Sequence, residues 1–302
     1  MKKYGVLVLA ILLFASGTLQ AQAAVKIPAV YVALGDSLAA GQTPNSKIDA
    51  GYADLIAQEL GRNQPVALFT KDLAFPGFTT QEVLDRVKSA KAKDVLARAN
   101  IITVSAGAND LLRLVQSNAA EGSLSFQQIQ ADFALNKARE NMGTILAELK
   151  TRAPQADVYV MGYYFAYPHA RDSQKQGTAK QLDRLNAILK QSADKAGAIF
   201  VSVDAAFGND AVDKVPNPAD VHPNVKGYQV MANAFLTQYQ KAWQVEDGEL
   251  PKANPLTFDQ VIQAQQQASA AETPALEGMG ASRPSENMEL EYLALREALP
   301  FI

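Results

Sequence analysis

The chain has 302 residues, of which 48% are hydrophobic and 20% charged, and its formal net charge is -3. This length and composition fit a globular protein with a sizeable core, built as one large domain or two small ones. Without a strongly basic segment, binding through nucleic-acid phosphates is not expected.

The N-terminus has the pattern of a secretory signal peptide over residues 1–24. Lys2 and Lys3 precede an almost wholly apolar segment from Gly5 to Leu19, and Ala21-Gln22-Ala23 forms a small-x-small cleavage site. The apolar segment is shorter than the roughly 20 residues of a membrane-spanning helix, so a retained membrane anchor is the less favoured alternative. The sequence therefore predicts a secreted protein, with a mature chain that starts near Ala24.

The sequence contains no cysteine, although export usually permits disulfides. We therefore expect packing, without disulfides, to supply the stability of the fold. The same absence excludes a cysteine nucleophile and cysteine metal ligands.

After the N-terminal segment, short apolar runs alternate with longer segments of helical periodicity. The runs are rich in β-branched or aromatic residues, and several are apolar without alternation, which is typical of parallel strands buried on both faces. The predicted strands are Val30–Leu34, Val66–Leu73, Ile101–Ser105, Val158–Gly162 and Ala198–Val203. The predicted helices are Tyr52–Leu60, Thr80–Val87, Ser125–Leu149, Ala179–Ala196 and Val225–Trp243. This alternation predicts an α/β fold with a parallel central sheet and right-handed crossovers.

Residues 244–302 differ in composition from the rest and are rich in Gln, Ala, Glu and Pro. We predict a domain over residues 25–243, followed by a polar tail or helical arm. Within this tail, Phe258–Ala268 and Glu289–Leu299 could form helices.

Gly35-Asp36-Ser37 directly follows the first predicted strand. Ligands of open α/β proteins bind outside the carboxyl ends of the strands, so a serine hydroxyl here is a candidate nucleophile. Asp and Ser are also good helix N-caps, which is the structural alternative.

Two further segments follow the second and third predicted strands. Gly77, in a Pro-Gly turn, leaves its N–H open to a ligand, and Asn109 follows the third strand with an amide that can donate to a developing negative charge. Both could instead be structural, Gly77 as a simple turn and Asn109 or Asp110 as a helix cap.

The chain has two histidines, His169 and His222. Asp220 lies two residues before His222 and could orient its imidazole, which would then accept the proton of Ser37. His169 has no such carboxylate nearby and is expected in a loop or at a rim. The order Ser…Asp-x-His differs from the Gly-x-Ser-x-Gly motif of the α/β-hydrolase fold, since position 39 is Ala.

Together, these segments closely resemble the SGNH (GDSL) family of serine esterases and lipases, particularly its lysophospholipase-L1-like members. The matching segments are GDSLAAG at 35–41, LAFPGFTT at 73–80, VSAGANDLL at 104–112 and DVHPNVKGY at 220–228. The resemblance spans about 190 residues and excludes the tail. It implies a flavodoxin-like three-layer α/β/α sandwich, ester hydrolysis without a cofactor, and no metal.

By position, the resemblance makes Ser37 the nucleophile, His222 the base and Asp220 its orienting acid. The backbone N–H groups of Ser37 and Gly77 and the side chain of Asn109 would form the oxyanion hole. The chain departs from the family twice. The common Asp-x-x-His spacing would put the acid at Ala219, and the segment around Gly77 has Asp72 where an Asn is usual.

Several alternatives remain at this stage. Asn209, Asp210 and Asp213 could hold a metal but are more typical of a solvated turn. A protein of the same fold could bind a glycan or lipid without cleaving it. Two further alternatives are an acetylesterase that acts on polysaccharide and an acyltransferase. We expect a small-molecule or lipid ester as substrate, with transient contact to a lipid surface and no nucleic-acid partner.

An acyl chain would need an apolar pocket close to Ser37. Seven apolar or aromatic residues follow strand ends and could line such a pocket or belong to the core. They are Phe75, Phe78, Leu111, Leu112, Tyr163, Tyr164 and Phe165.

Overall fold

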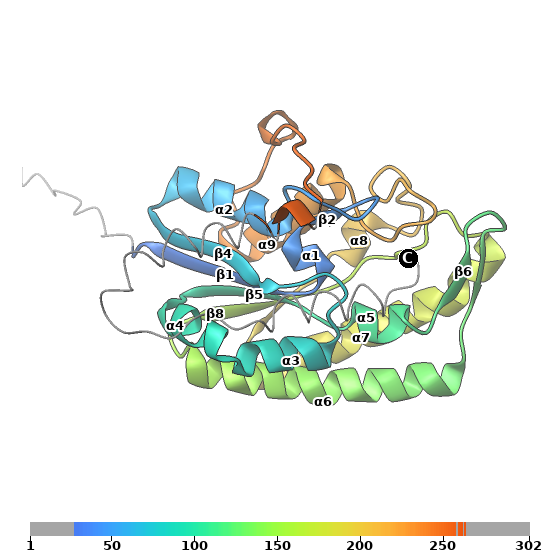
Figure 1. Ribbon diagram of the computed structural model, residues 1–302, viewed down its shortest axis with the longest axis horizontal. Helices are drawn as coiled ribbons and strands as arrows, with labels where there is room; N and C mark the ends of the chain where they lie inside the picture. Colours follow the sequence, from blue (N-terminus) through green and yellow to red (C-terminus); the bar gives the residue numbers. More distant parts are fainter. Residues whose placement is uncertain (1–26, 258, 262, 264–302) are drawn as a thin grey trace, which may run out of the picture.

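The structure is a computed structural model that describes residues 27–257, 259–261 and 263. Its centre is a parallel sheet in which the strands lie in the order β4-β1-β5-β8-β9 (Figure 1). Taken in chain order these five strands are arranged 2-1-3-4-5, the flavodoxin-like order. The strands are β1 (Ala29–Gly35), β4 (Val66–Ala74), β5 (Ile101–Ser105), β8 (Asp157–Met161) and β9 (Ile199–Val201).

Burial explains why the apolar runs form the middle of this sheet. Every residue of β5 is buried, and six of the seven residues of β1 are buried as well. Gly35, at the end of β1, is paired with Ala74 of β4 on one side and with Ser105 of β5 on the other. The carboxyl ends of these three strands are therefore level at one edge of the sheet, where the strand order reverses.

Helices cover both faces of the sheet (Figure 1). The helices α2 (Tyr52–Asn63) and α9 (Val225–Tyr239) pack together on one face. On the other face, the long helix α6 (Gln128–Arg152) packs between α3 (Thr80–Lys88) and α7 (Asp172–Ala196). The predicted three-layer α/β/α fold with a parallel sheet is confirmed.

Several elements differ from the sequence prediction in extent. Helix α7 begins at Asp172, seven residues before the predicted start, because the first two turns are mostly polar and give no apolar periodicity. The sequence analysis did not predict α4 (Ala90–Arg98). It also missed two short hairpins, formed by β2 (Gln42–Thr43) with β3 (Lys47–Ile48) and by β6 (Gln116–Asn118) with β7 (Ser123–Ser125).

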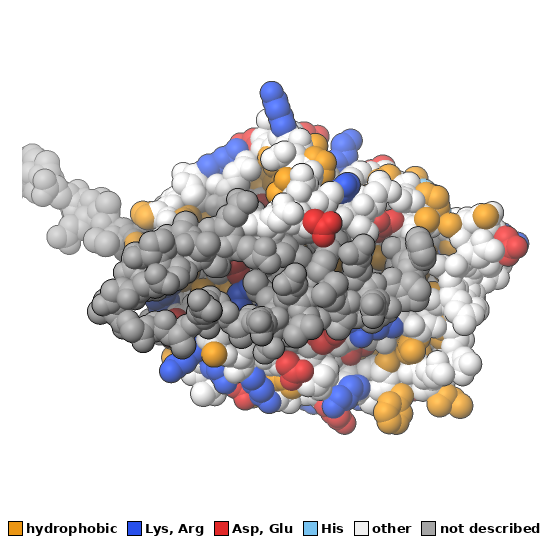
Figure 2. Space-filling model, viewed as in Figure 1, with side chains coloured by type: hydrophobic (Ala, Val, Ile, Leu, Met, Phe, Trp, Pro, Cys, Tyr) orange, Lys and Arg blue, Asp and Glu red, His pale blue; other side chains and the backbone are white. Residues whose placement is uncertain are grey.

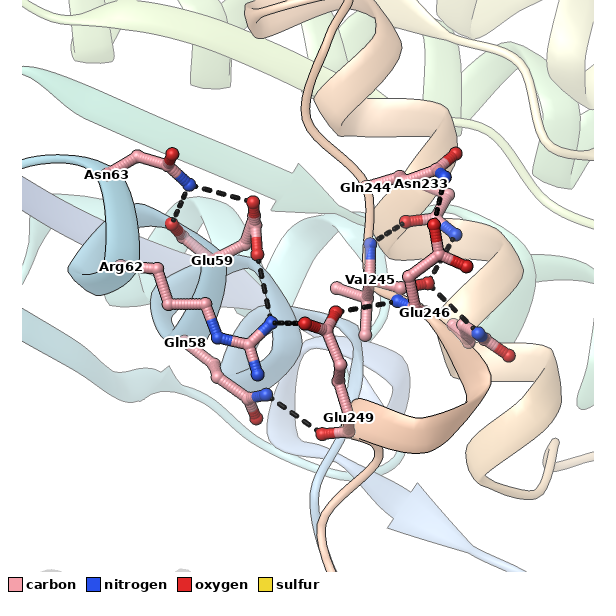
Figure 3. A network of polar contacts seen from close by, with 10 residues as sticks. Gln58, Glu59, Arg62, Asn63, Asn233, Gln244, Val245, Glu246 and Glu249 are labelled. Carbon is pink, nitrogen blue, oxygen red and sulfur yellow. Dashed lines mark hydrogen bonds and ion pairs between the residues drawn. The ribbon is translucent and has the colours of Figure 1, made fainter.

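The packed part of the chain continues beyond Trp243. Val245 is buried, and its N–H and C=O bond the side chain of Asn233 at 2.8 and 3.1 Å. In the short 3-10 helix Asp247–Glu249, Glu249 pairs with Arg62 of α2 at 2.7 Å (Figure 3). Residues 244–249 thus connect α9 to α2.

Most of the predicted tail lies outside the described residues. Of the proposed helix Phe258–Ala268 only residues 259–261 and 263 are described, and these are helical. The proposed helix Glu289–Leu299 and the predicted signal peptide lie entirely outside them. Within the described part of the chain, no helix has both the length and the apolar character needed to cross a membrane.

Candidate active site

Ser37 lies in the tight turn that follows β1. Gly35 has a φ of +140°, and a Cβ at this position would approach the carbonyl oxygen of Ser105 to 2.0 Å, so only glycine fits. Asp36 caps the short helix α1 (Ser37–Ala40) by accepting the N–H of Leu38 at 3.0 Å. The predicted N-cap is thus Asp36, which leaves the hydroxyl of Ser37 available for another partner.

That partner is His222, which lies in the loop before α9. The Oγ of Ser37 is 2.9 Å from Nε2 of His222, and Nδ1 of His222 is 2.5 Å from Oδ1 of Asp220. A carboxylate only accepts, so Asp220 favours the tautomer with the proton on Nδ1 and leaves Nε2 to accept from the Ser37 hydroxyl. The structure therefore brings the three residues expected to form a triad into one chain of hydrogen bonds.

The local turn explains how Asp220 reaches His222 across the short Asp-x-His spacing. Its Oδ1 also accepts the backbone N–H of His222 at 3.0 Å, and its Oδ2 accepts the N–H of Asn45 at 2.8 Å. Burial raises the pKa of Asp220, but the hydrogen bonds from His222 and Asn45, together with the charge of His222, hold that pKa below the usual value of an aspartate. Both carboxylate oxygens are thus fixed.

Asn45 is a contact that the sequence analysis missed. It lies in the turn of the β2–β3 hairpin with a φ of +65°, a conformation that asparagine tolerates better than most residues. The sequence Pro44-Asn45-Ser46 does indicate a turn, but nothing in it shows that the turn lies beside Asp220, 175 residues later.

The three expected oxyanion donors come from loops that follow neighbouring strands. Asn109, in α5 (Ala108–Leu112), donates from Nδ2 to the carbonyl of Phe78 at 2.9 Å, which orients its amide and uses one of its two N–H bonds. Gly77 has a φ of +82°, and its carbonyl accepts from Arg113 at 2.7 Å. In the described chain, the N–H groups of Ser37 and Gly77 donate to no other protein group.

Asp110 ties the Gly77 loop to the Asn109 helix. It accepts the N–H of Thr80 at 2.9 Å and the hydroxyl of Thr80 at 2.7 Å, while Asn141 of α6 donates to the same hydroxyl at 3.0 Å. Burial raises the pKa of Asp110, and the bonds from Thr80 oppose that shift. This network fixes the relative position of two of the three donors.

Asp36 is the second buried carboxylate beside Ser37. Its Oδ2 accepts the hydroxyl of Tyr163 at 2.5 Å. Burial raises the pKa of Asp36 to about 6, although the hydrogen bonds from Tyr163 and Leu38 lower it. Sequence reasoning considered Asp36 only as a helix cap, and Tyr163 only as a pocket-lining or core residue.

A pocket that opens to solvent begins at the Ser37–His222 pair, and its volume is about 820 Å³ when the open space at its mouth is included. Of the seven residues that could line an acyl pocket, five do so, and they are Leu111, Leu112, Tyr163, Tyr164 and Phe165. The other two, Phe75 and Phe78, pack against each other with ring centroids 5.2 Å apart and are not part of its lining.

The remaining candidate residues lie apart from this constellation. His169 bonds the carbonyl of Val215 at 2.8 Å and lines a small separate cavity. Asp210 pairs with Lys175 at 2.5 Å, and Asp213 pairs with Lys214 at 3.3 Å. Among the residues that the structure describes, no three His, Asp or Glu side chains gather as a metal site would require.

Comparison with known families agrees with this geometry. The pattern of the GDSL-like lipase/acylhydrolase family matches residues 33–230, about two thirds of the chain, and includes all four segments described above. The protein belongs to the GDSL-like lipase/acylhydrolase family. Members of this family are described as lipases and acylhydrolases, and membership supports a carboxylic ester hydrolase that takes a small-molecule ester.

Individual relatives of this GDSL-like protein are distant. An uncharacterised protein of Bacillus subtilis, YpmR, is 21% identical over 224 residues, which cover 70% of this chain and 82% of YpmR. Among solved structures, the lipase Lip_vut3 from a goat rumen metagenome has a TM-score of 0.55 at 20% identity, and covers 68% of this chain and 94% of its own. A variant of the acetylxylan esterase Axe2 from Geobacillus stearothermophilus has a TM-score of 0.51 at 19% identity, and the match covers 72% of this chain and 95% of the Axe2 chain. These likenesses show the fold.

Proposed function

We propose that the protein is a secreted serine esterase or lipase that hydrolyses lipid or other acyl esters through a Ser37–His222–Asp220 triad. The observation that carries this proposal is the unbroken chain from Ser37 Oγ to His222 Nε2 at 2.9 Å and from His222 Nδ1 to Asp220 at 2.5 Å. A nucleophile, a base and an orienting acid in contact are what covalent acyl transfer requires. The pattern of a signal peptide supports secretion.

In the first half of the reaction, Ser37 Oγ attacks the carbonyl carbon of the ester while His222 Nε2 takes the hydroxyl proton. The electron pair of the carbonyl moves onto its oxygen, where the N–H groups of Ser37, Gly77 and Asn109 stabilise the negative charge. Asp220 holds His222 in the tautomer that can accept the proton and stabilises the imidazolium that forms.

The tetrahedral intermediate then expels the alcohol, which receives the proton from His222 Nε2, and leaves an acyl group on Ser37. Water attacks this acyl-enzyme by the same route, with His222 as base, and releases the carboxylic acid. An alcohol in place of water would give acyl transfer by the same steps.

Substitution of Ser37 tests the proposal. The mature protein and its Ser37→Ala variant are assayed on soluble esters of graded chain length, with the surface variant Ser125→Ala as the matched control. We expect Ser37→Ala to lose on the order of 10⁶-fold in kcat, because the nucleophile is gone, and Ser125→Ala to lose nothing. Equal turnover by wild type and Ser37→Ala would overturn the assignment of the nucleophile.

The same experiment separates the proposed enzyme from a glycan- or lipid-binding protein of the same fold. A binding protein would retain the ester or glycan without releasing an acid, in wild type and variant alike. A protein that cleaves acetyl esters and no longer ones would instead be an acetylesterase acting on polysaccharide.

A further inference from the structure

The pocket that begins at Ser37 extends along α7. Leu185, Leu182 and Thr178 line it in succession from one helical turn to the next, and Gly107, directly before α5, lies against Leu185. Seven residues of α-helix rise about 10 Å, so the pocket is several times longer than an acetyl group, whose two carbons are about 1.5 Å apart. Figure 1 shows α6 and α7 extending past the sheet on the side of α5 and β6.

Four polar residues join α6 to α7 beside the distal part of this pocket. Gln181, itself a lining residue, donates to Gln128 at 3.1 Å, and Gln128 donates to Asp132 at 2.8 Å. Arg184 completes the set with bonds to Asp132 at 2.6 Å and to Gln181 at 2.8 Å. We call these four residues the α6–α7 polar bridge.

Ala131 is the α6 residue that faces the pocket at this level. It lies between Gln128 and Asp132 in sequence, is 1% exposed and lines the pocket together with Gln181 and Thr178. A methyl group is the smallest side chain with a Cβ. Because the α6–α7 polar bridge occupies the space beside Ala131, a larger side chain at this position would project into the pocket.

We propose that this pocket binds the acyl chain of the ester and that Ala131, backed by the α6–α7 polar bridge, sets the longest chain that fits. The inference rests on the proposed function, since the pocket serves the reaction only if Ser37 is acylated. Ala131, Thr178 and Gln181 form the distal wall of the pocket, and Ala131 is the specificity-determining position in it. Leu182 and Leu185 contact the acyl chain nearer Ser37.

A pocket of fixed length should give a kcat/KM that depends on acyl-chain length up to a limit. Burial of one methylene is worth about 0.8 kcal/mol, which is about fourfold in kcat/KM per added CH₂. An extended chain advances roughly 1.25 Å per carbon, so about 10 Å holds roughly eight carbons. We expect kcat/KM to rise from the acetyl ester to about this length and then to stop rising or fall.

The experiment compares Ala131→Phe with wild type on a series of soluble esters from acetyl to dodecanoyl. We expect Ala131→Phe to lose at least about tenfold on esters of eight or more carbons, because the ring occupies the distal pocket, and to keep acetyl turnover within about twofold. The acetyl activity reports a folded enzyme with an intact triad. Ala131→Leu, a smaller change, should shorten the profile by fewer carbons.

Ala134→Phe is the matched control, because Ala134 is on the same helix, one turn away, but lines an outer groove and not this pocket. Its chain-length profile should match wild type. A profile unchanged in both Ala131 variants, or shortened equally by Ala134→Phe, would overturn the inference. Retention of activity by Ser37→Ala would instead contradict the proposed function, so the two failures are distinguishable.

Discussion

Two loops at the same edge of the sheet each hold a buried aspartate next to the Ser37–His222 pair, and the two carboxylates behave in opposite ways. Asp36, in the turn after β1, has its pKa raised to about 6 by burial, with Tyr163 and the N–H of Leu38 as its partners. Asp220, in the loop before α9, has its pKa lowered, because the charge of His222 and the hydrogen bonds from His222 and Asn45 together outweigh its burial.

The difference shows that position beside a nucleophile does not by itself give a carboxylate a catalytic role. Among the described residues, the side chain of Asp36 hydrogen-bonds Tyr163 and the N–H of Leu38, and it holds the turn that presents Ser37. Asp220 contacts the imidazole directly and has both of its oxygens fixed by further N–H donors. We therefore propose that Asp220 orients His222 and that Asp36 positions the turn.

Among the substitutions that test this comparison, removal of the charge of Asp220 should lower kcat the most. We expect Asp220→Asn to lower kcat about 10⁴-fold, because an amide can stabilise the wrong tautomer of His222. KM should change little. Steady-state kinetics on a soluble ester measure both, and Asp36→Asn should lose far less. A variant within tenfold of wild type would mean that another acid, such as Asp204 or Asp213, orients His222.

Loss of the Asn109 amide should have the next largest effect on kcat. Removal of one oxyanion-hole donor typically lowers kcat by about 10²- to 10³-fold, and we expect that range for Asn109→Ala. The Asp110 network remains in this variant, so the unfolding midpoint should stay close to that of wild type. Turnover unchanged by the substitution would show that Ser37 and Gly77 hold the oxyanion without the side chain.

Asp36→Asn should have the smallest effect on turnover and a clear effect on the pH dependence of stability. Because the folded pKa of Asp36 is about 6 against 3.8 unfolded, the folded protein keeps a proton that the unfolded chain has lost between these pH values. The wild-type free energy of unfolding should therefore decrease as pH rises from about 4 to above 6, by up to about 3 kcal/mol from this group.

The asparagine variant lacks this contribution. Urea unfolding of both proteins at pH 4 and pH 7 should show the stability difference between them shifting in favour of Asp36→Asn at the higher pH. An identical pH dependence in the two proteins would contradict the burial-raised pKa.

The sequence predicted the strands of the central sheet, and its resemblance to a known family named the triad and oxyanion-hole residues expected in the candidate site. Short apolar runs without alternation are the signal of buried parallel strands, and the scarcity of histidine limited the search for a base to His169 and His222. The Asp-x-His spacing is shorter than the common spacing of the family, and the local turn still places the carboxylate of Asp220 2.5 Å from the imidazole of His222.

Contacts between distant segments could not be predicted in the same way. Asn45 meets Asp220, and Tyr163 meets Asp36, through loops that only the folded sheet brings together. The positions of the apolar residues that follow the strand ends could not be predicted either. Leu111 and Leu112 line the pocket, whereas Phe75 and Phe78 pack against each other, and no local pattern separates the two pairs.

Covalent labelling of Ser37 tests the central claim most directly. A fluorophosphonate that mimics the tetrahedral intermediate is incubated with the mature protein, and the modified residue is located by mass spectrometry of the tryptic peptides. We predict a single adduct on Ser37, absent in Ser37→Ala and formed much more slowly in His222→Ala. An adduct on another serine, or equal labelling of Ser37→Ala, would contradict the account.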